Sequence, residues 1–204
     1  AILNGDTKTG VTTMYMEETL DSGDIILQEE ADIGENETTG ELWDRLSKLG
    51  ASLLSKTLEK IEEGTIESKK QGDNYTVTKM LSKEMAYINW EEKSAREIKN
   101  LVRALNPIMG AYSFLNGKKI KFWEVDVVLI DEFIDKFSDF KQYKKRLEEV
   151  TPGAVIYVDE KCGLYIRAKD DIIVVKQIQG ENAKRMGIGD FLRGNKIQVA
   201  EIFE

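Results

Sequence analysis

The sequence contains no histidine and only one cysteine, Cys162, among its 204 residues. Without histidine, the chain holds no Ser-His-Asp or Cys-His nucleophile system of its own. It also holds no His-containing zinc site, and one thiolate is too few for the sulfur-ligated kind, so we expect no metal. Acid–base chemistry must therefore use Asp, Glu, Lys or Tyr, or residues of another chain. Cys162 cannot form an internal disulfide, which fits a cytoplasmic location, and we interpret it as a loop or strand-edge thiol.

Long apolar runs are also missing. The longest ones are only a few residues, far short of the roughly 20 that a membrane-spanning helix needs. Residues 1–6 lack the basic and then apolar pattern of a signal peptide. With 41% hydrophobic and 32% charged residues, the composition is that of an ordinary soluble protein. We expect a monomer with no membrane partner.

The net charge of −8 is distributed unevenly along the chain. Residues 1–75 carry 17 acidic and seven basic side chains, whereas residues 76–204 carry 20 acidic and 22 basic ones. An acidic front and a faintly basic back indicate two units with different partners. The back is not basic enough to demonstrate nucleic-acid binding, because an ordinary solvated surface explains the same charge.

The front of the chain has the pattern of two strands and one long helix. Residues 10–16 and 25–28 are rich in β-branched and apolar side chains and predict strands. Thr38 followed by Glu41 is a capping box that starts a helix, and Gly64 stops it. We interpret the apolar residues that recur at helical spacing as a core stripe: Leu42, Leu46, Leu49, Leu53, Leu54, Leu58 and Ile61. Because two strands and one helix make a poor independent core, we expect residues 1–67 to be the C-terminal part of a larger α/β domain.

The back of the chain has the pattern of a small β domain that follows a polar linker over residues 68–92. Ser94 and Glu97 form a second capping box, which opens a short helix that ends before Pro107. Asn116-Gly117 is a strong hairpin signal, and residues 154–158, 164–168 and 172–178 predict three more strands.

An amphipathic helix is expected over residues 131–150, inserted among these strands, and residues 190–193 predict a helical turn. Five or so short strands in residues 93–204 favour an OB-like β-barrel. Such barrels often bind oligonucleotides, although a fold alone does not give a function.

Six segments resemble the methionyl-tRNA formyltransferase family, occur in the family's order and cover most of the chain: NGDTKTGVTTMYMEETLDSGDIILQ, KMLSKEMAYINW, RALNP, GKKIKFWEV, TPGAVI and KRMGIGDFLRGN. The first is the most specific, because folate-dependent formyltransferases share it. It includes a Leu-Asp-x-Gly loop that carries the acidic member of an Asn-His-Asp catalytic set. The resemblance therefore implies Asp21 as the catalytic carboxylate, with Asp24 as the second candidate.

The resemblance also implies a fold and its ligands. Residues 1–67 would be the C-terminal part of a Rossmann-like domain that holds 10-formyltetrahydrofolate, and residues 93–204 an OB-like barrel that helps to hold charged initiator tRNA. The reaction passes the formyl group to the α-amine of methionine on that tRNA. The folate site would be lined, mostly through backbone groups, by Met16, Glu17, Glu18, Thr19 and Leu20.

Basic side chains of the back half are the candidates for contacts with the tRNA. Phosphate contacts from Lys and Arg supply affinity with little sequence information. Taken alone, each such side chain is more often a solvated charge. The candidates are Arg103, Lys118, Lys119, Lys121, Arg167, Lys169, Lys184, Arg185, Arg193 and Lys196.

The chain departs from the family pattern in two ways. The Asn-x-His segment and the Ser-Leu-Leu-Pro loop are absent, and the helix expected over residues 131–150 stands where a short link is expected. In the family, the Asn and the His donate to the developing oxyanion, which is usually the largest catalytic contribution. A carboxylate with an ordinary pKa cannot donate at neutral pH, so we expect Asp21 alone to leave this chain inactive.

Two other functions fit the same residues. A sugar-nucleotide N-formyltransferase would use the same folate chemistry but would be indifferent to tRNA. A non-catalytic RNA-binding remnant would bind tRNA without any turnover. An ordinary structural or interaction domain is a third reading, and it would bind neither tRNA nor folate.

Overall fold

The computed structural model describes residues 1–72, 75–137, 147 and 149–204, which divide into two compact units. Unit 1 consists of Ala1 and residues 6–81, and unit 2 consists of residues 2–5 and 82–204. The linker expected over residues 68–92 is therefore shared between them. Its last residues belong to the core of unit 2, where Ala86, Ile88 and Trp90 are buried.

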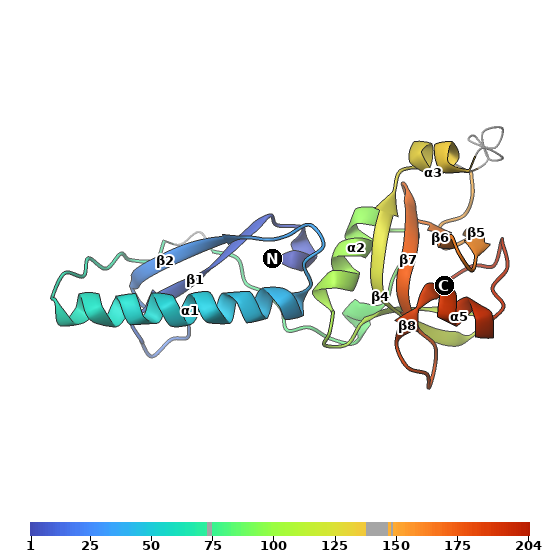
Figure 1. Cartoon of the computed structure of the whole chain (residues 1–204). Coiled ribbons are helices and arrows are strands. Elements are labelled where there is room, and N and C mark those ends of the chain that lie inside the picture. The colour runs from blue at the N-terminus through green and yellow to red at the C-terminus, as the bar shows by residue number, and fades with distance from the viewer. Residues whose placement is uncertain (73–74, 138–146, 148) are drawn as a thin grey trace. The chain divides into compact units, whose positions relative to one another are not determined.

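Unit 1 is a two-stranded antiparallel sheet with one long helix. The strands are β1 (Lys8–Met14) and β2 (Ile25–Asp32), and the helix is α1 (Thr39–Glu62). Figure 1 shows α1 running along the β1–β2 hairpin. Both strands and the helix occur where the sequence predicts them, although β1 ends two residues earlier and β2 continues four residues further.

The ends of α1 follow the local signals in the sequence. Thr38 Oγ1 accepts from the Glu41 N–H, and the Glu41 carboxylate accepts from the Thr38 N–H at 2.9 Å, which completes the capping box. These hydrogen bonds from Thr38 hold the pKa of Glu41 below its usual value. After Glu63, which caps the C-terminus, Gly64 adopts a positive φ of 65°.

The core stripe expected on α1 is only partly buried. Leu42 and Leu53 are buried, and Thr57 beside them donates to the Leu53 carbonyl. The prediction is wrong for Leu54, Leu58 and Ile61, whose side chains are exposed. Helical spacing shows which residues share a face, but it does not show how much of that face a two-stranded sheet can cover.

The helical elements in the described part of unit 2 are short. They are η1 (Ile2–Asn4), η2 (Glu84–Ala86), α2 (Ala95–Ala104), α3 (Ile130–Lys136) and α5 (Ile188–Gly194). The capping box of Ser94 and Glu97 starts α2 as predicted. In the helix expected over residues 131–150, residues 138–146 and 148 lie outside the described residues, and α3 covers its beginning.

Six strands form the antiparallel sheet of unit 2. They are β3 (Ala111–Leu115), β4 (Lys118–Val128), β5 (Val155–Asp159), β6 (Gly163–Arg167), β7 (Ile172–Gln179) and β8 (Met186–Gly187). The order is β3-β4-β7-β6-β5, and β8 pairs with β7. The hairpin predicted at Asn116-Gly117 joins β3 to β4, and both turn residues have positive φ, as a type I′ turn requires.

The strand pairing in the described part of unit 2 does not close into a barrel, so the OB-like barrel is not confirmed. The paired strands run from β3 at one edge to β5 at the other. The C-terminal residues lie along both edges. Phe114 and Glu204 exchange two backbone hydrogen bonds of 3.0 and 2.9 Å, and the Val155 N–H donates to the Glu201 carbonyl at 2.8 Å.

Candidate functional site

The loop that carries Asp21 joins β1 to β2 in unit 1 and projects into solvent. Met16 and Leu20 are 97% and 92% exposed. Glu17, Glu18 and Thr19 between them are also exposed, as is Asp21 itself. The structure thus brings the five residues of the predicted folate site and the catalytic candidate Asp21 together on one exposed loop, with Asp21 in the left-handed region at φ 55°.

The close approach of the two ends of this loop explains why residue 23 is glycine. The Tyr15 N–H donates to the Asp24 carbonyl at 3.0 Å. A Cβ on Gly23 would lie 1.7 Å from the Tyr15 carbonyl oxygen, which no side chain can tolerate. The second candidate carboxylate, Asp24, is half-buried where the loop enters β2.

One side chain that the sequence did not point to fixes this loop. Gln71 Nε2 donates to the Asp21 carbonyl and to the Gly23 carbonyl, both at 2.8 Å. Gln71 lies close to the bridge between Ile25 and Lys69, which pairs its segment with the start of β2. A glutamine in a polar stretch carries no sequence signal for such a contact, because 48 to 50 residues separate it from its acceptors.

In unit 2, the outer side of β3 and β4 combines rings with basic side chains. Tyr112 is paired with Lys121 and Phe114 with Lys119 across the two strands. The Lys119 ammonium lies 3.5 Å from the centroid of the Tyr112 ring, and the Lys121 ammonium lies 5.7 Å from that of Trp123. We call these residues, together with Arg185, the cation–aromatic face.

Arg185 is the best-positioned cation of this face. Its guanidinium lies 5.1 Å from the Trp123 ring centroid. Its Nε donates to Gln177 Oε1 at 2.6 Å, and its Nη1 donates to Asn106 Oδ1 at 3.2 Å. These bonds use two of the five N–H groups of a guanidinium, so an exposed side chain is held in one orientation and retains donors for a phosphate.

The other basic candidates fall into two groups. Arg103 and Arg167 are buried and bound within the chain: Arg103 donates to Asn100, and Arg167 to the Leu147 and Asp171 carbonyls. Both arginines are therefore buried and do not lie on the surface, where the prediction placed them. The exposed candidates outside the cation–aromatic face are Lys118, Lys169, Lys184, Arg193 and Lys196. Among these, Arg193 is paired with Asp190, and Lys169 contacts the Glu92 carbonyl.

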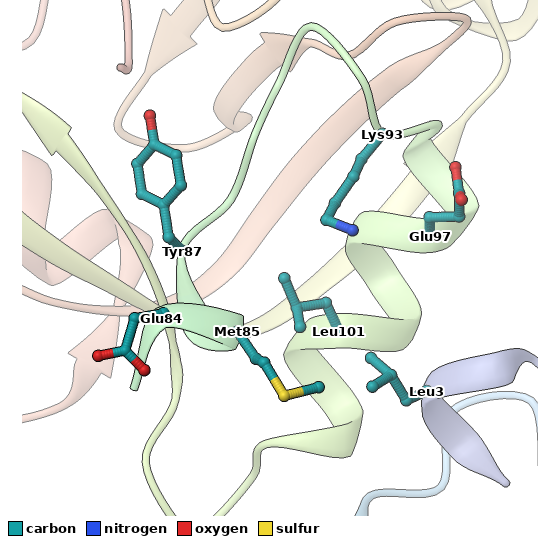
Figure 2. A pocket seen from close by; sticks show the side chains of 7 residues that line it. All are labelled: Leu3, Glu84, Met85, Tyr87, Lys93, Glu97 and Leu101. Carbon is teal, nitrogen blue, oxygen red and sulfur yellow. The ribbon is translucent and has the colours of Figure 1, made fainter. Parts of the chain in front are cut away.

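Unit 2 also has a surface pocket of about 320 Å³, shown in Figure 2. It is lined by Leu3, Glu84, Met85, Tyr87, Lys93, Glu97 and Leu101. The Glu97 carboxylate is occupied by Ser94, which donates from its N–H at 2.8 Å and its hydroxyl at 2.6 Å. With two carboxylates and one ammonium, the lining does not suit a phosphate-rich ligand.

Two features are absent from the residues that the structure describes. No three His, Cys, Asp or Glu side chains in the described ranges come together as a metal-binding group. No helix in the part of the chain that the structure describes has the length and apolarity needed to cross a membrane.

A family model described as formyl transferase, C-terminal domain, matches residues 80–196, and a model described as formyl transferase matches residues 1–58. The chain belongs to the formyl transferase family. The first match covers β3, β4 and Arg185, and the second covers the Asp21 loop, so both candidate surfaces lie in segments typical of formyl transferases.

One relative of this chain is the methionyl-tRNA formyltransferase of Lachnospira eligens. The two are 41% identical over 200 residues, which is 98% of this chain and 59% of the relative. The chain thus spans about three-fifths of the length of that relative.

Solved structures share the fold of this formyl transferase family chain. HypX from Aquifex aeolicus, in complex with tetrahydrofolic acid, has a TM-score of 0.62 at 18% identity, covering 98% of this chain and 35% of that one. An N-formyltransferase from Helicobacter canadensis, in complex with folinic acid and dTDP-3-aminofucose, has a TM-score of 0.57 at 22% identity, covering 85% and 58%.

Proposed function

We propose that this chain is part of a methionyl-tRNA formyltransferase, which transfers a formyl group from 10-formyltetrahydrofolate to the amine of methionine on initiator tRNA. The observation that carries the proposal is the 41% identity to a methionyl-tRNA formyltransferase across 98% of the chain. The chain spans 59% of that relative, so the activity of the whole protein is part of the proposal. We also propose that the protein is cytoplasmic and monomeric, and that its first domain ends at residue 67 and its second begins at residue 93.

Asp21 is the proposed catalytic carboxylate. Its loop projects from unit 1, and the two bonds from Gln71 fix the backbone on both sides of Ser22. In this role, Asp21 aligns a histidine that donates to the oxyanion of the tetrahedral intermediate. The chain contains no histidine, so the 204-residue polypeptide alone is inactive. Turnover of labelled formyl donor by the purified chain would contradict this.

Residues 16–20 are proposed to contact the folate donor, which supplies the formyl carbon that the amine attacks. This segment is exposed, so a ligand can approach it; within the loop, the Thr19 carbonyl also accepts from the Ser22 hydroxyl at 2.9 Å. A solved relative with the same fold is in complex with tetrahydrofolic acid, which supports a folate ligand for this family.

Unit 2 is proposed to bind the tRNA through the cation–aromatic face. Lys119, Lys121 and Arg185 supply positive charge there, and two exposed lysines add to it, Lys118 at the start of β4 and Lys184 next to Arg185. We propose that unit 2 is OB-like, because its C-terminal residues hydrogen-bond to both edges of the sheet.

Fluorescence anisotropy of initiator tRNA across a salt series tests the tRNA proposal. We expect log affinity to fall linearly with log salt, with a slope of about −0.9 for each phosphate contact in double-stranded regions. Absence of binding even at low salt would contradict the proposal.

A sugar-nucleotide N-formyltransferase is the alternative. The likeness to the enzyme from Helicobacter canadensis supports a common fold only, at 22% identity, whereas the methionyl-tRNA formyltransferase relative is 41% identical. The alternative predicts that a dTDP-linked amino sugar binds and that tRNA does not. The same anisotropy measurement therefore separates the two.

A further inference from the structure

We propose that the outer side of the β3–β4 hairpin binds unpaired RNA bases by stacking on Tyr87, Tyr112 and Phe114, which we call the aromatic row. The proposal rests on the tRNA-binding function proposed above. It goes further, because it assigns single-stranded nucleotides to this face as the class of ligand. Phosphate contacts alone do not select that class.

The aromatic row is continuous, although it comes from two segments. The ring centroids of Tyr112 and Phe114 lie 5.7 Å apart on β3, and those of Tyr87 and Tyr112 lie 5.9 Å apart. The Ile88 N–H donates to the Tyr112 carbonyl at 2.8 Å, which holds the segment of Tyr87 against β3. Tyr87 is 37% exposed, and the other two rings are half-buried.

Strand alternation directs the rings of Tyr112 and Phe114 to the side of β3 opposite its fully buried residues, although Tyr112 packs in part against the core. The neighbours of Tyr112 on β3, Ala111 and Ser113, are fully buried, whereas Tyr112 and Phe114 point to the opposite side. Successive side chains of a strand point to opposite faces. Packing of the core therefore does not explain why two successive residues on the outer face of β3 are both aromatic. Aromatic side chains at such positions are typical of surfaces on which bases stack.

Cations run beside the aromatic row on the neighbouring strand. Lys121 is directly opposite Tyr112, and Lys119 is opposite Phe114. Paired strands lie about 4.8 Å apart, so a nucleotide whose base lies on a ring has its phosphate within reach of a lysine. Single-strand binders combine these two features, a basic groove for the backbone and rings for the bases.

The Lys119 ammonium covers one side of the Tyr112 ring at 3.5 Å, so a base that stacks there must displace it. An exposed cation–π contact corresponds to roughly a two- to fivefold change in an equilibrium constant. A stacked base corresponds to roughly a five- to 150-fold change in affinity. The gain in affinity from stacking is therefore larger than the loss from breaking the cation–π contact, and the displaced ammonium can pair with the phosphate.

Three labelled probes of equal length, about eight nucleotides, test the proposal with the full chain: single-stranded RNA, an abasic oligonucleotide with the same phosphates, and blunt duplex RNA. We expect the single strand to bind at least about tenfold more tightly than the abasic probe. Equal affinities for these two probes would overturn the stacking proposal, even where initiator tRNA binds in a salt-dependent manner. Failure of all three probes and of initiator tRNA would overturn both this proposal and the proposed function.

Single-residue variants test whether the aromatic row causes the preference for single-stranded RNA over the abasic probe. Tyr87→Leu and Tyr112→Leu should each lower the affinity for single-stranded RNA by about five- to 150-fold and leave the abasic probe unchanged. Tyr112→Phe keeps the ring and should retain binding. The matched control is Tyr75→Leu, which removes an exposed tyrosine of unit 1. An unchanged preference in the folded Tyr87→Leu and Tyr112→Leu variants would overturn the assignment.

Discussion

The guanidinium of Arg185 lies 5.1 Å from the ring centroid of Trp123, and it also donates to the side-chain oxygen of Asn106 at 3.2 Å. Asn106 in turn donates from Nδ2 to the Trp123 carbonyl at 2.8 Å. These residues come from three separate segments of the sequence, RALNP, GKKIKFWEV and KRMGIGDFLRGN. The fold therefore brings three of the family-like segments together at one cation on the surface of unit 2.

Replacing Arg185 with Ala should weaken the binding of initiator tRNA and reduce the slope of log affinity against log salt by about 1, because one phosphate contact is lost. Arg185→Lys should keep part of the affinity, since it keeps the charge but not the planar fork that Asn106 and Gln177 orient. The measurement is fluorescence anisotropy across a salt series for both variants.

Lys161→Ala is the matched control for Arg185→Ala, because Lys161 is an exposed cation of unit 2 on the turn between β5 and β6. Its salt slope should remain that of the unchanged chain. Equal slopes for Arg185→Ala and Lys161→Ala would show that Arg185 makes no phosphate contact.

Features that depend on neighbours in the sequence could be predicted. The capping boxes at Thr38 and Ser94 and the hairpin at Asn116-Gly117 occur as expected, because each is formed by residues within a few positions of one another. Except for β8, the strands of both units lie within a few residues of the predicted ones, since apolar and β-branched runs report local backbone preference.

Features that depend on distant residues could not be predicted. Arg103 and Arg167 are predicted as surface cations, but both are buried in unit 2, where Arg167 also donates to the Leu147 carbonyl, 20 residues away. The contacts of Gln71 with the Asp21 loop span about fifty residues. Composition and periodicity carry no information about such pairs, because the partners become neighbours only after folding.

The Asp21 loop should lose its fixed conformation when Gln71 is replaced with Leu. The side chain makes two hydrogen bonds to the loop carbonyls, each contributing about 1 kcal/mol. We expect hydrogen exchange to become faster in residues 16–24 and to remain unchanged in α2. Gln28→Leu is the matched control, because Gln28 bonds to the Thr12 side chain on the hairpin and not to the loop. Unchanged exchange in the loop of Gln71→Leu would mean that the two bonds do not hold it.

Stability at low pH should depend on the pair formed by Lys99 and Asp126. Lys99 Nζ donates to Asp126 Oδ1 at 2.9 Å, with the side chains 8% and 47% exposed. Burial raises the pKa of Asp126, but hydrogen bonds from Lys99 and the Val127 N–H outweigh burial and hold the pKa below 3.8. A lowered carboxylate pKa stabilises the folded state above the unfolded pKa, and this stabilisation is lost as the pH falls through the folded value.

Asp126→Asn should therefore reduce the free energy of unfolding by about 1 kcal/mol at pH 7, a modest value because Asp126 is nearly half exposed. The difference from the unchanged chain should shrink below about pH 4. Urea unfolding at several pH values measures this difference in the free energy of unfolding. The control is Asp190→Asn, because Asp190 forms an exposed ion pair with Arg193 on α5. A deficit that is the same at all pH values would exclude ionisation of Asp126 as its cause.

Phe203 should contribute more to the stability of unit 2 than its place near the C-terminus suggests. Its side chain is 1% exposed, and its ring centroid lies 5.4 Å from that of Phe122 and 6.1 Å from that of Trp90. Its N–H donates to the Gly153 carbonyl at 2.9 Å. The ring therefore belongs to the core, although only an isolated bridge to Leu115 pairs its backbone with a strand.

Phe203→Ala should lower the free energy of unfolding of unit 2 by about 3–5 kcal/mol, the usual range for removing a buried phenyl ring. Ile202→Ala is the matched control, because Ile202 is the preceding residue and is 46% exposed; it should cost about 1 kcal/mol or less. Urea unfolding followed by tryptophan fluorescence measures both, since Trp90 and Trp123 lie in unit 2. Similar losses for the two variants would mean that the C-terminal residues lie on the sheet without forming part of its core. A large loss for Phe203→Ala alone would show that this ring is part of the core of unit 2.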